Sequence, residues 1–162
     1  MKTYTILKDT REKLGWEFEA SVTFTGYESF ALKTGDYTIK EFKDILCVER
    51  KRNTAEIYNN IFTEKGDRFE RELERMRDFK YSYIIFEFNM NEIINFPYGS
   101  GIPRYQQKYM KANGFALLKR LSELQLKYPY IQFVYAGAYG KEYLLSLFKR
   151  IVEKEEQCLK NL

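Results

Sequence analysis

The chain has 162 residues, which is enough for one domain with a hydrophobic core and hardly enough for two. Its residues are 44% hydrophobic, 31% charged and 17% aromatic, with a net charge of +4, a composition typical of folded domains rather than disordered chains. Histidine is absent and cysteine occurs only twice, which excludes Ser-His-Asp and Cys-His catalysis, imidazole-containing zinc sites and a disulfide framework. Any catalysis must therefore use carboxylates, Lys, Arg, Tyr or a metal ion bound by oxygen.

The first third of the chain is predicted to be mostly β. Alternating and β-rich segments predict strands at 3–8, 17–24, 27–32, 37–40 and 45–51. Thr25-Gly26 separates the second and third of these segments, which favours a hairpin or meander there. The Gly35-Asp36 pair is expected to turn the chain into the fourth strand.

From about residue 54 onward, helical and strand patterns alternate. Thr54 and Asp67 are expected to cap a short helix and a helix over 68–79. Further elements are strands at 81–88 and 130–136, a loop at 96–103, a helix from about 106 or 113 to 127, and a helix from 141 to about 159. Because the two later strands are almost continuously apolar, helices should cover the sheet on both faces. The order predicts a three-layer α/β domain.

No segment resembles a signal peptide or a membrane helix. The first residues run directly into a strand pattern without an apolar stretch, and the longest apolar run is far below the ~18 residues that span a bilayer. We therefore expect a cytoplasmic protein with reduced thiols and no membrane partner.

Two carboxylates and a lysine are expected to meet on the predicted sheet. Glu49 and Lys51 are two residues apart on a strand, so their side chains leave the same face, opposite to Arg50. Asp36 begins the preceding strand, which can pair with this one through the turn at 40–44. Two carboxylates suit Mg²⁺ or Mn²⁺, and a neighbouring ammonium suits the orientation or deprotonation of a water and the neutralisation of a phosphate.

The acid-x-Lys triplet is weak by itself, because residues 41–43 and 78–80 also match it. The alternative interpretation of Glu49 and Lys51 is an exposed ion pair worth less than about 1 kcal/mol. The apolar run at 45–48 favours a central strand over an edge strand and therefore favours the site.

These segments resemble the XPF-type endonuclease domain of the PD-(D/E)XK nuclease superfamily. The GD…ERK signature of that family is similar to Gly35-Asp36 followed by Glu49-Arg50-Lys51, and residues 8–12 (KDTRE) are similar to its D-x-R-E element. Residues 66–73 (GDRFEREL) resemble the glycine-arginine helix start that follows the active-site strands. The three motifs occur in the family's order over about residues 4–90, and the order of elements extends the resemblance to about residue 150.

The resemblance implies a restriction-endonuclease-like three-layer α/β/α fold with a mixed central sheet. Residues 1–162 would form a single nuclease domain without the helix-hairpin-helix domain common in the family, as in a stand-alone nuclease of phage or mobile-element type. The implied activity is Mg²⁺- or Mn²⁺-dependent hydrolysis of DNA phosphodiester bonds at branched, flap or junction DNA, which leaves 5′-phosphate and 3′-hydroxyl ends.

The resemblance also implies roles for individual residues. Asp36 and Glu49 would be metal ligands, and Lys51 would position or activate the attacking water. Asp9 and Glu12 would stand at the edge of the site as auxiliary acidic or supporting groups.

This chain departs from the family's active-site pattern at one position. An Asp usually follows the motif lysine by four residues, where this chain has Ala55 with Glu56 next to it, so that carboxylate is lost or displaced. Arg11 and Arg50 would hold local structure or contact phosphate.

The segment 96–122 contains no acidic residue, and its basic residues alternate with tyrosines. Basic side chains neutralise phosphates and tyrosines stack on unpaired bases, so we expect DNA contacts from Arg104, Tyr105, Lys108 and Lys111. Arg68 is a further DNA-binding candidate, because it begins a helix whose free N–H groups favour anions. The alternative for the segment is a solvated helix face beside a mobile loop.

Two other functions compete with a structure-specific endonuclease. One is a catalytically silent DNA-binding or partner subunit, which the intact Asp36, Glu49 and Lys51 disfavour. The other is a RecB- or restriction-like nuclease that acts on ends or single strands. The apolar face of the C-terminal helix fits a homodimer interface or packing within the chain equally well.

Overall fold

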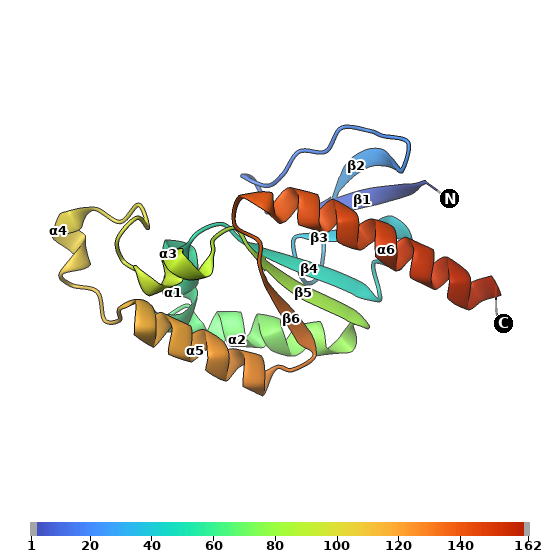
Figure 1. Ribbon diagram of the computed structural model, residues 1–162. Helices are drawn as coiled ribbons and strands as arrows, with labels where there is room; N and C mark the ends of the chain where they lie inside the picture. Colours follow the sequence, from blue (N-terminus) through green and yellow to red (C-terminus); the bar gives the residue numbers. More distant parts are fainter. Residues whose placement is uncertain (1–2, 161–162) are drawn as a thin grey trace.

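The computed structural model describes residues 3–160 and contains a six-stranded mixed sheet with the order β2-β1-β3-β4-β5-β6 (Figure 1). The strands are β1 (Tyr4–Asp9), β2 (Phe24–Phe30), β3 (Tyr37–Ile39), β4 (Leu46–Lys51), β5 (Tyr81–Phe86) and β6 (Ile131–Tyr135). β3 is antiparallel to both of its neighbours, whereas β1 and β2, β4 and β5, and β5 and β6 pair in parallel.

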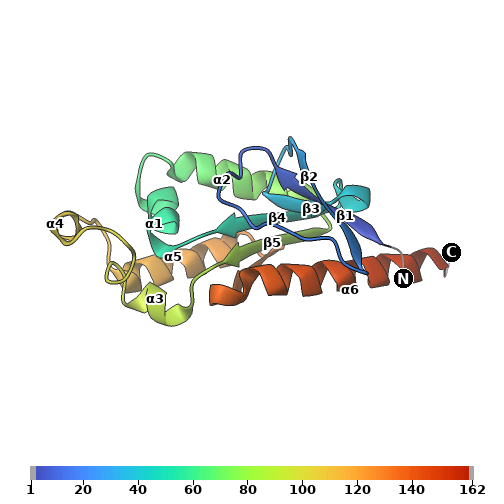
Figure 2. The same cartoon turned by 90° about the horizontal axis from the view of Figure 1, so that it is seen from above.

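Helices cover both faces of this sheet. The α-helices are α1 (Thr54–Phe62), α2 (Gly66–Arg75), α3 (Met90–Ile94), α4 (Arg104–Gln107), α5 (Gly114–Lys127) and α6 (Gly140–Lys160). Side chains of α1, α2, α3 and α5 form one hydrophobic cluster with β4 and β5, and α6 joins a second cluster with β1, β3, β4 and β5. Figure 2 shows α2 and α6 on opposite faces of the sheet, which confirms the predicted three-layer α/β arrangement.

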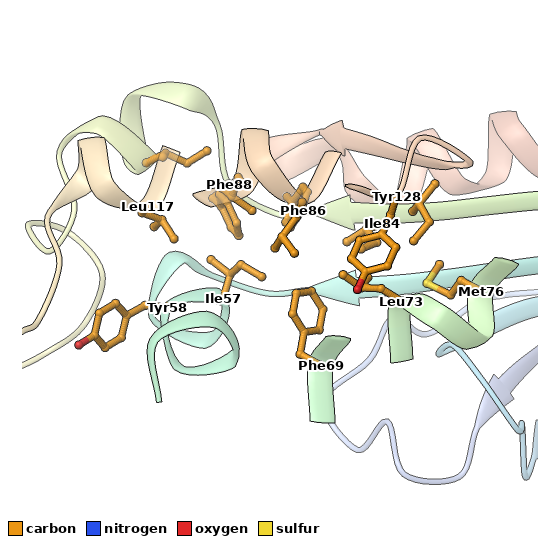
Figure 3. Close-up of a cluster of buried hydrophobic side chains, with 14 of the residues drawn as sticks. Ile57, Tyr58, Phe69, Leu73, Met76, Ile84, Phe86, Phe88, Leu117 and Tyr128 are labelled. Carbon is orange, nitrogen blue, oxygen red and sulfur yellow. The ribbon is translucent and has the colours of Figure 1, made fainter. Parts of the chain in front are cut away.

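Apolar side chains of α2 pack against the sheet. Phe69 and Leu73 of α2 lie against Ile84 and Phe86 of β5, next to Ile57 of α1 (Figure 3). Full burial of a side chain of this size contributes roughly 1.5–3 kcal/mol relative to exposure.

On the opposite face, Leu144 and Phe148 of α6 are fully buried against the sheet. Packing within the chain therefore accounts for the apolar face of this helix, and a homodimer interface stays a prediction.

The hairpin predicted over residues 17–32 is wrong. β2 is a single strand that runs through Thr25-Gly26 and pairs in parallel with β1, while residues 10–23 contain no strand. A parallel pair needs a crossover, and this irregular segment provides it, with Trp16 stacked on Tyr37 and Phe18 buried in the core. The aromatic residues that suggested a strand thus serve core packing.

The ends of the helices differ slightly from the predictions. Asn53 rather than Thr54 caps α1, because its Oδ1 accepts a hydrogen bond of 2.9 Å from the Glu56 N–H. Asp67 lies within the first turn of α2 and makes no capping bond. α2 ends at Arg75, and residues 76–78 continue as a 3₁₀ turn.

Asn113 caps α5, so the Asn113-Gly114 pair separates it from α4 as one of the two predicted alternatives had it. Within residues 3–160, no helix is long and apolar enough to cross a membrane. The expectation about a signal peptide concerns in part the first two residues, which lie outside the described range.

Candidate active site

The pairing of β3 with β4 brings Asp36, Glu49 and Lys51 into one pocket of about 260 Å³. Glu49 and Lys51 are buried, and Asp36 is half-buried. β4 lies between β3 and β5 in the sheet, as the apolar run before Glu49 predicted. The further residues that line this pocket include Asp9, Arg11, Glu56, Asn60, Lys65, Arg68 and Glu72.

Backbone contacts hold Asp36 in place. Its N–H donates to the Val48 carbonyl at 2.8 Å, and its Oδ2 accepts from the Arg50 N–H at 2.8 Å. The preceding Gly35 has φ +80°, and a Cβ there would lie 2.7 Å from Cys47 Sγ and 3.0 Å from the Val48 carbonyl oxygen. The close approach of the two strands therefore requires glycine at this position.

Lys51 is enclosed by carboxylates and an aromatic ring. Its Nζ lies 2.5 Å from Glu49 Oε1, 4.0 Å from Glu72 Oε2 and 5.0 Å from the centre of the Phe69 ring. Although burial lowers the pKa of Lys51, the Glu49 and Glu72 carboxylates raise it above its ordinary value. Lys51 is thus an ammonium group that neutralises part of the surrounding negative charge.

The ionised forms of the two candidate metal ligands, Asp36 and Glu49, are disfavoured in this pocket. Burial and the charge of Glu49 raise the pKa of Asp36 well above its usual range. Burial raises the pKa of Glu49 to about 7, with Glu72 adding to the increase and Lys51 opposing it. Lys51 therefore compensates this cluster only partly, and a cation beside Asp36 and Glu49 would be favourable.

The donor atoms fit a hard divalent cation. Asp36 and Glu49 offer oxygen, which Mg²⁺ and Mn²⁺ prefer. Within residues 3–160, no group of three or more His, Cys, Asp or Glu side chains is arranged to hold a metal ion. Mg²⁺ is commonly held by one or two carboxylates with water and substrate as its remaining ligands, so the Asp36–Glu49 pair is compatible with such a site.

Asp9 lines the same pocket, but its oxygens are occupied by Arg11 and Leu32. Oδ1 accepts from Arg11 N and Nε, both at 2.7 Å, and Oδ2 accepts from Arg11 Nη2 at 2.9 Å and Leu32 N at 2.8 Å. Although burial raises the pKa of Asp9, these donors hold it below its ordinary value. Asp9 thereby fixes the guanidinium of Arg11 at the pocket.

Arg50 and Glu12 do not line this pocket. Arg50 Nη1 lies 3.0 Å from Glu12 Oε1, its Nη2 pairs with Glu87, and its guanidinium lies 5.1 Å from the centre of the Trp16 ring. Arg50 is only 8% exposed. Of the two roles expected for Arg50, this position favours holding local structure over contact with DNA, and it makes Glu12 the partner of Arg50.

Arg68 lines the pocket, as expected for a DNA-binding candidate, and two carboxylates that were not assigned to the site join it there. Glu72 follows Arg68 by four residues on α2, so helical spacing places both on one side of the helix. Glu56 accepts from Arg52 N at 2.8 Å and lines the pocket from α1. It therefore places a carboxylate at the pocket, next to Ala55 in the sequence.

Three of the predicted DNA-binding residues gather in a second, wider hollow. Arg104, Lys108 and Lys111 line a space of about 790 Å³ together with Tyr98. Tyr105 does not line it, but its side chain is 67% exposed on α4. The segment that contains these residues and α4 extends away from the sheet beyond α1 and α3 (Figures 1 and 2).

No family model and no curated protein matches the chain. Among solved structures, the chain is similar to XPF from Aeropyrum pernix, with a TM-score of 0.59 and 17% identity over 97% of this chain and 69% of that one. The same protein in complex with DNA gives a TM-score of 0.57 and 19% identity over 94% of this chain and 66% of that one. The chain thus spans about two thirds of the length of these proteins. The similarity establishes the fold, and it confirms the XPF-type, restriction-endonuclease-like α/β fold expected from the sequence motifs.

Proposed function

We propose that this chain is a metal-dependent endonuclease that hydrolyses DNA phosphodiester bonds at the pocket of Asp36, Glu49 and Lys51. The observation that carries the proposal is the meeting of two carboxylates with a buried ammonium on adjacent strands of an XPF-like fold. The complex of the similar Aeropyrum pernix protein with DNA supports DNA as the substrate. The described residues would act as a single nuclease domain.

Mg²⁺ or Mn²⁺ would be held by Asp36 and Glu49, and when bound it would supply Lewis-acid activation of water and phosphate. Lys51 donates hydrogen bonds from its ammonium and thereby orients the attacking water or a phosphate oxygen. Glu72, whose Oε2 lies 4.0 Å from Lys51 Nζ, restrains that ammonium from the side of α2.

Arginines at the same pocket are suited to the phosphates on either side of the cut. Arg68 lines the pocket from α2, and Arg11 lines it from the segment after β1 with its side chain 63% exposed. Asp9 orients Arg11 through bonds to Nε and Nη2. Charge-assisted contacts of this kind fix the backbone of DNA without reading its sequence.

The substrate in this proposal is branched, flap or junction DNA, and the products carry 5′-phosphate and 3′-hydroxyl ends. The sequence motifs support this class, since it is the class on which XPF-type domains act. A nuclease for ends or single strands would use the same residues and differ only in the DNA that it accepts.

The test is cleavage of a panel of labelled linear, flap, splayed and four-way DNAs with and without Mg²⁺ or Mn²⁺. We expect metal-dependent cleavage of at least one branched DNA, and a loss of at least about 10³-fold in Asp36→Asn and in Lys51→Ala. Glu41 and Lys43 are exposed and provide matched controls, Glu41→Gln and Lys43→Ala, which should cut at the wild-type rate.

Mobility shifts in EDTA complete the test, because Asp36→Asn and Lys51→Ala should still bind DNA. Cleavage that survives both substitutions would overturn the assignment of the site. Wild-type binding without cleavage in either metal would replace the proposal with a catalytically silent DNA-binding subunit.

A further inference from the structure

Residues 97–113, here called the arm, leave the domain after Phe96 and rejoin it at Gly114, and Ile102, Met110 and Ala112 pack against the core. The Gly114 N–H donates to the Phe96 carbonyl at 3.0 Å and closes the base of the arm. A Cβ on Gly114 would overlap the Ile94 carbonyl oxygen, so this closure requires glycine. The Phe96 ring stacks on Tyr58 of α1 with ring centres 5.2 Å apart. The arm is thus a projection with a fixed base (Figure 1).

The arm exposes aromatic side chains instead of packing them. No residue in the described range 97–113 is buried, and Tyr98, Tyr105 and Tyr109 are 72%, 67% and 74% exposed. Large aromatic side chains ordinarily stabilise a fold by burial, so three exposed ones contribute little to this fold. Each presents an exposed ring to a planar group, and Lys108 Nζ lies 4.9 Å from the centre of the Tyr109 ring.

The arm is also positively charged. It carries Arg104, Lys108 and Lys111 and no acidic residue, and among residues 3–160 none of these three forms an ion pair. Together with Tyr98 they surround the hollow of about 790 Å³. Cations that no carboxylate neutralises, next to exposed rings, are complementary to a chain of phosphates that bears unstacked bases.

From this combination we propose that the arm binds single-stranded DNA, with phosphates on Arg104, Lys108 and Lys111 and bases on the exposed tyrosines. Duplex DNA is a poorer occupant, because its bases are already stacked on one another and offer no free face to a ring. The inference rests on the proposed function in one respect, namely that DNA is the polyanion.

The position of the arm connects it with the catalytic pocket. The Lys111 N–H donates to the Tyr58 hydroxyl at 3.1 Å, and Tyr58 belongs to the same helix as Glu56 and Asn60, which line the pocket. β4 and β5 are parallel, so α1 and the connection to the arm leave the sheet at the same edge. A DNA strand that passes the pocket therefore reaches the arm by crossing α1.

The experiment measures binding without cleavage, by fluorescence anisotropy of the full chain in EDTA. The probes are a fluorescein-labelled 20-mer of thymidine and a blunt duplex of equal length. In the triple variant Tyr98→Ala, Tyr105→Ala, Tyr109→Ala, we expect the affinity for the single strand to fall at least tenfold and that for the duplex to change less than threefold. Tyr139→Ala is the matched control, because Tyr139 is equally exposed at 73% but precedes α6.

The basic residues provide a second measurement. Lys108→Ala and Lys111→Ala should weaken binding of the single strand and lower the slope of log K against log salt by roughly 0.7 for each phosphate that the variant no longer neutralises. Thermal unfolding checks that the variants fold, which we expect because no arm side chain is buried.

Equal binding of the single strand by the triple variant and wild type would overturn the proposal, as would an equal loss for strand and duplex. Tighter binding of an RNA 20-mer with the same dependence on the tyrosines would replace DNA by RNA as the ligand. Because no metal is present, these outcomes are independent of cleavage. A protein that binds the strand through the arm but cuts no DNA would refute the proposed function and leave this inference standing.

Discussion

The two faces of β4 near its C-terminal end bury charge in opposite ways. On one face, Arg50 is matched by Glu12 and Glu87 and covered by Trp16. On the other, Lys51 faces Glu49 and Glu72 with Asp36 close by, and both Asp36 and Glu49 have raised pKa values. On the first face two carboxylates offset the charge of the guanidinium, although Arg50 Nε has no hydrogen-bond partner among the described residues, whereas the second face has carboxylates that only an added cation or proton relieves. This contrast supports the proposed function, in which the first face holds the fold and the second receives a cation.

The largest difference between the two faces should appear in catalysis. Glu49→Gln should lower DNA cleavage by about 10³-fold, whereas Glu12→Gln should leave the rate per folded molecule within about threefold of wild type. Initial rates on the preferred DNA, corrected for the folded fraction, measure both. Equal losses would show that Glu12 belongs to the catalytic site, as the sequence motif suggested.

Removal of Arg50 should have the largest effect on stability. Arg50→Met leaves Glu12 and Glu87 without their buried partner, which should lower the free energy of unfolding by about 3–5 kcal/mol. Urea unfolding followed by circular dichroism measures the change. A loss of less than about 1 kcal/mol would contradict the view that this network supports the fold.

Removal of the Asp9 charge, which Arg11 offsets, should lower stability as removal of Arg50 does. Asp9→Asn weakens the hold on Arg11 and should cost about 1–3 kcal/mol at pH 7. The folded-state pKa lies below the ordinary 3.8, so ionised Asp9 stabilises the fold above that pH, and this contribution is lost as the pH falls through the folded-state value. Urea midpoints of variant and wild type should therefore converge in acid, and a gap of constant size would refute the charge-based explanation.

The smallest expected effect has the opposite sign. Asp36→Asn keeps an acceptor for the Arg50 N–H but removes a charge beside Glu49, so it should stabilise the metal-free protein by about 0.5–2 kcal/mol at pH 8. Because the folded-state pKa of Asp36 is raised above 3.8, wild type loses stability as the pH rises from that value, and the advantage of the variant should grow with pH.

Added Mg²⁺ should raise the melting temperature of wild type more than that of Asp36→Asn, since only the wild type keeps both ligands. An Asp36→Asn variant that is less stable than wild type at pH 8 without metal would contradict this explanation of the raised pKa.

Local sequence patterns were sufficient to predict which residues meet in the central part of the candidate site. The alternation of residues along a strand put Glu49 and Lys51 on one face, and the short turn before β4 put Asp36 beside them. The apolar face of the C-terminal helix, which packs on the sheet as α6, followed in the same way from helical spacing. These relations involve residues close in sequence, for which the backbone geometry of a strand or helix is decisive.

Contacts between segments that are far apart in the sequence could not be predicted in this way. The parallel pairing of β2 with β1 depends on the crossover through Trp16 and Phe18, whose aromatic residues favoured a strand locally. Arg50 pairs with Glu87, which follows β5, and only the assembled sheet reveals this pairing. Glu72 was not assigned to the site, because the orientation of α2 over β4 is set by tertiary packing.

The closed base of the arm has a consequence for how such a domain changes over evolution. Because Phe96 and Gly114 are joined by a hydrogen bond of 3.0 Å, the residues between them start and end at one place, and Ile102, Met110 and Ala112 among them pack against the core. The entropy of closing a loop depends only weakly on its length, so a change of length between these anchoring residues should cost the rest of the fold little. Under the proposed function, the selection of the nucleic acid and the chemistry of the cut would thereby lie in separable parts of the chain.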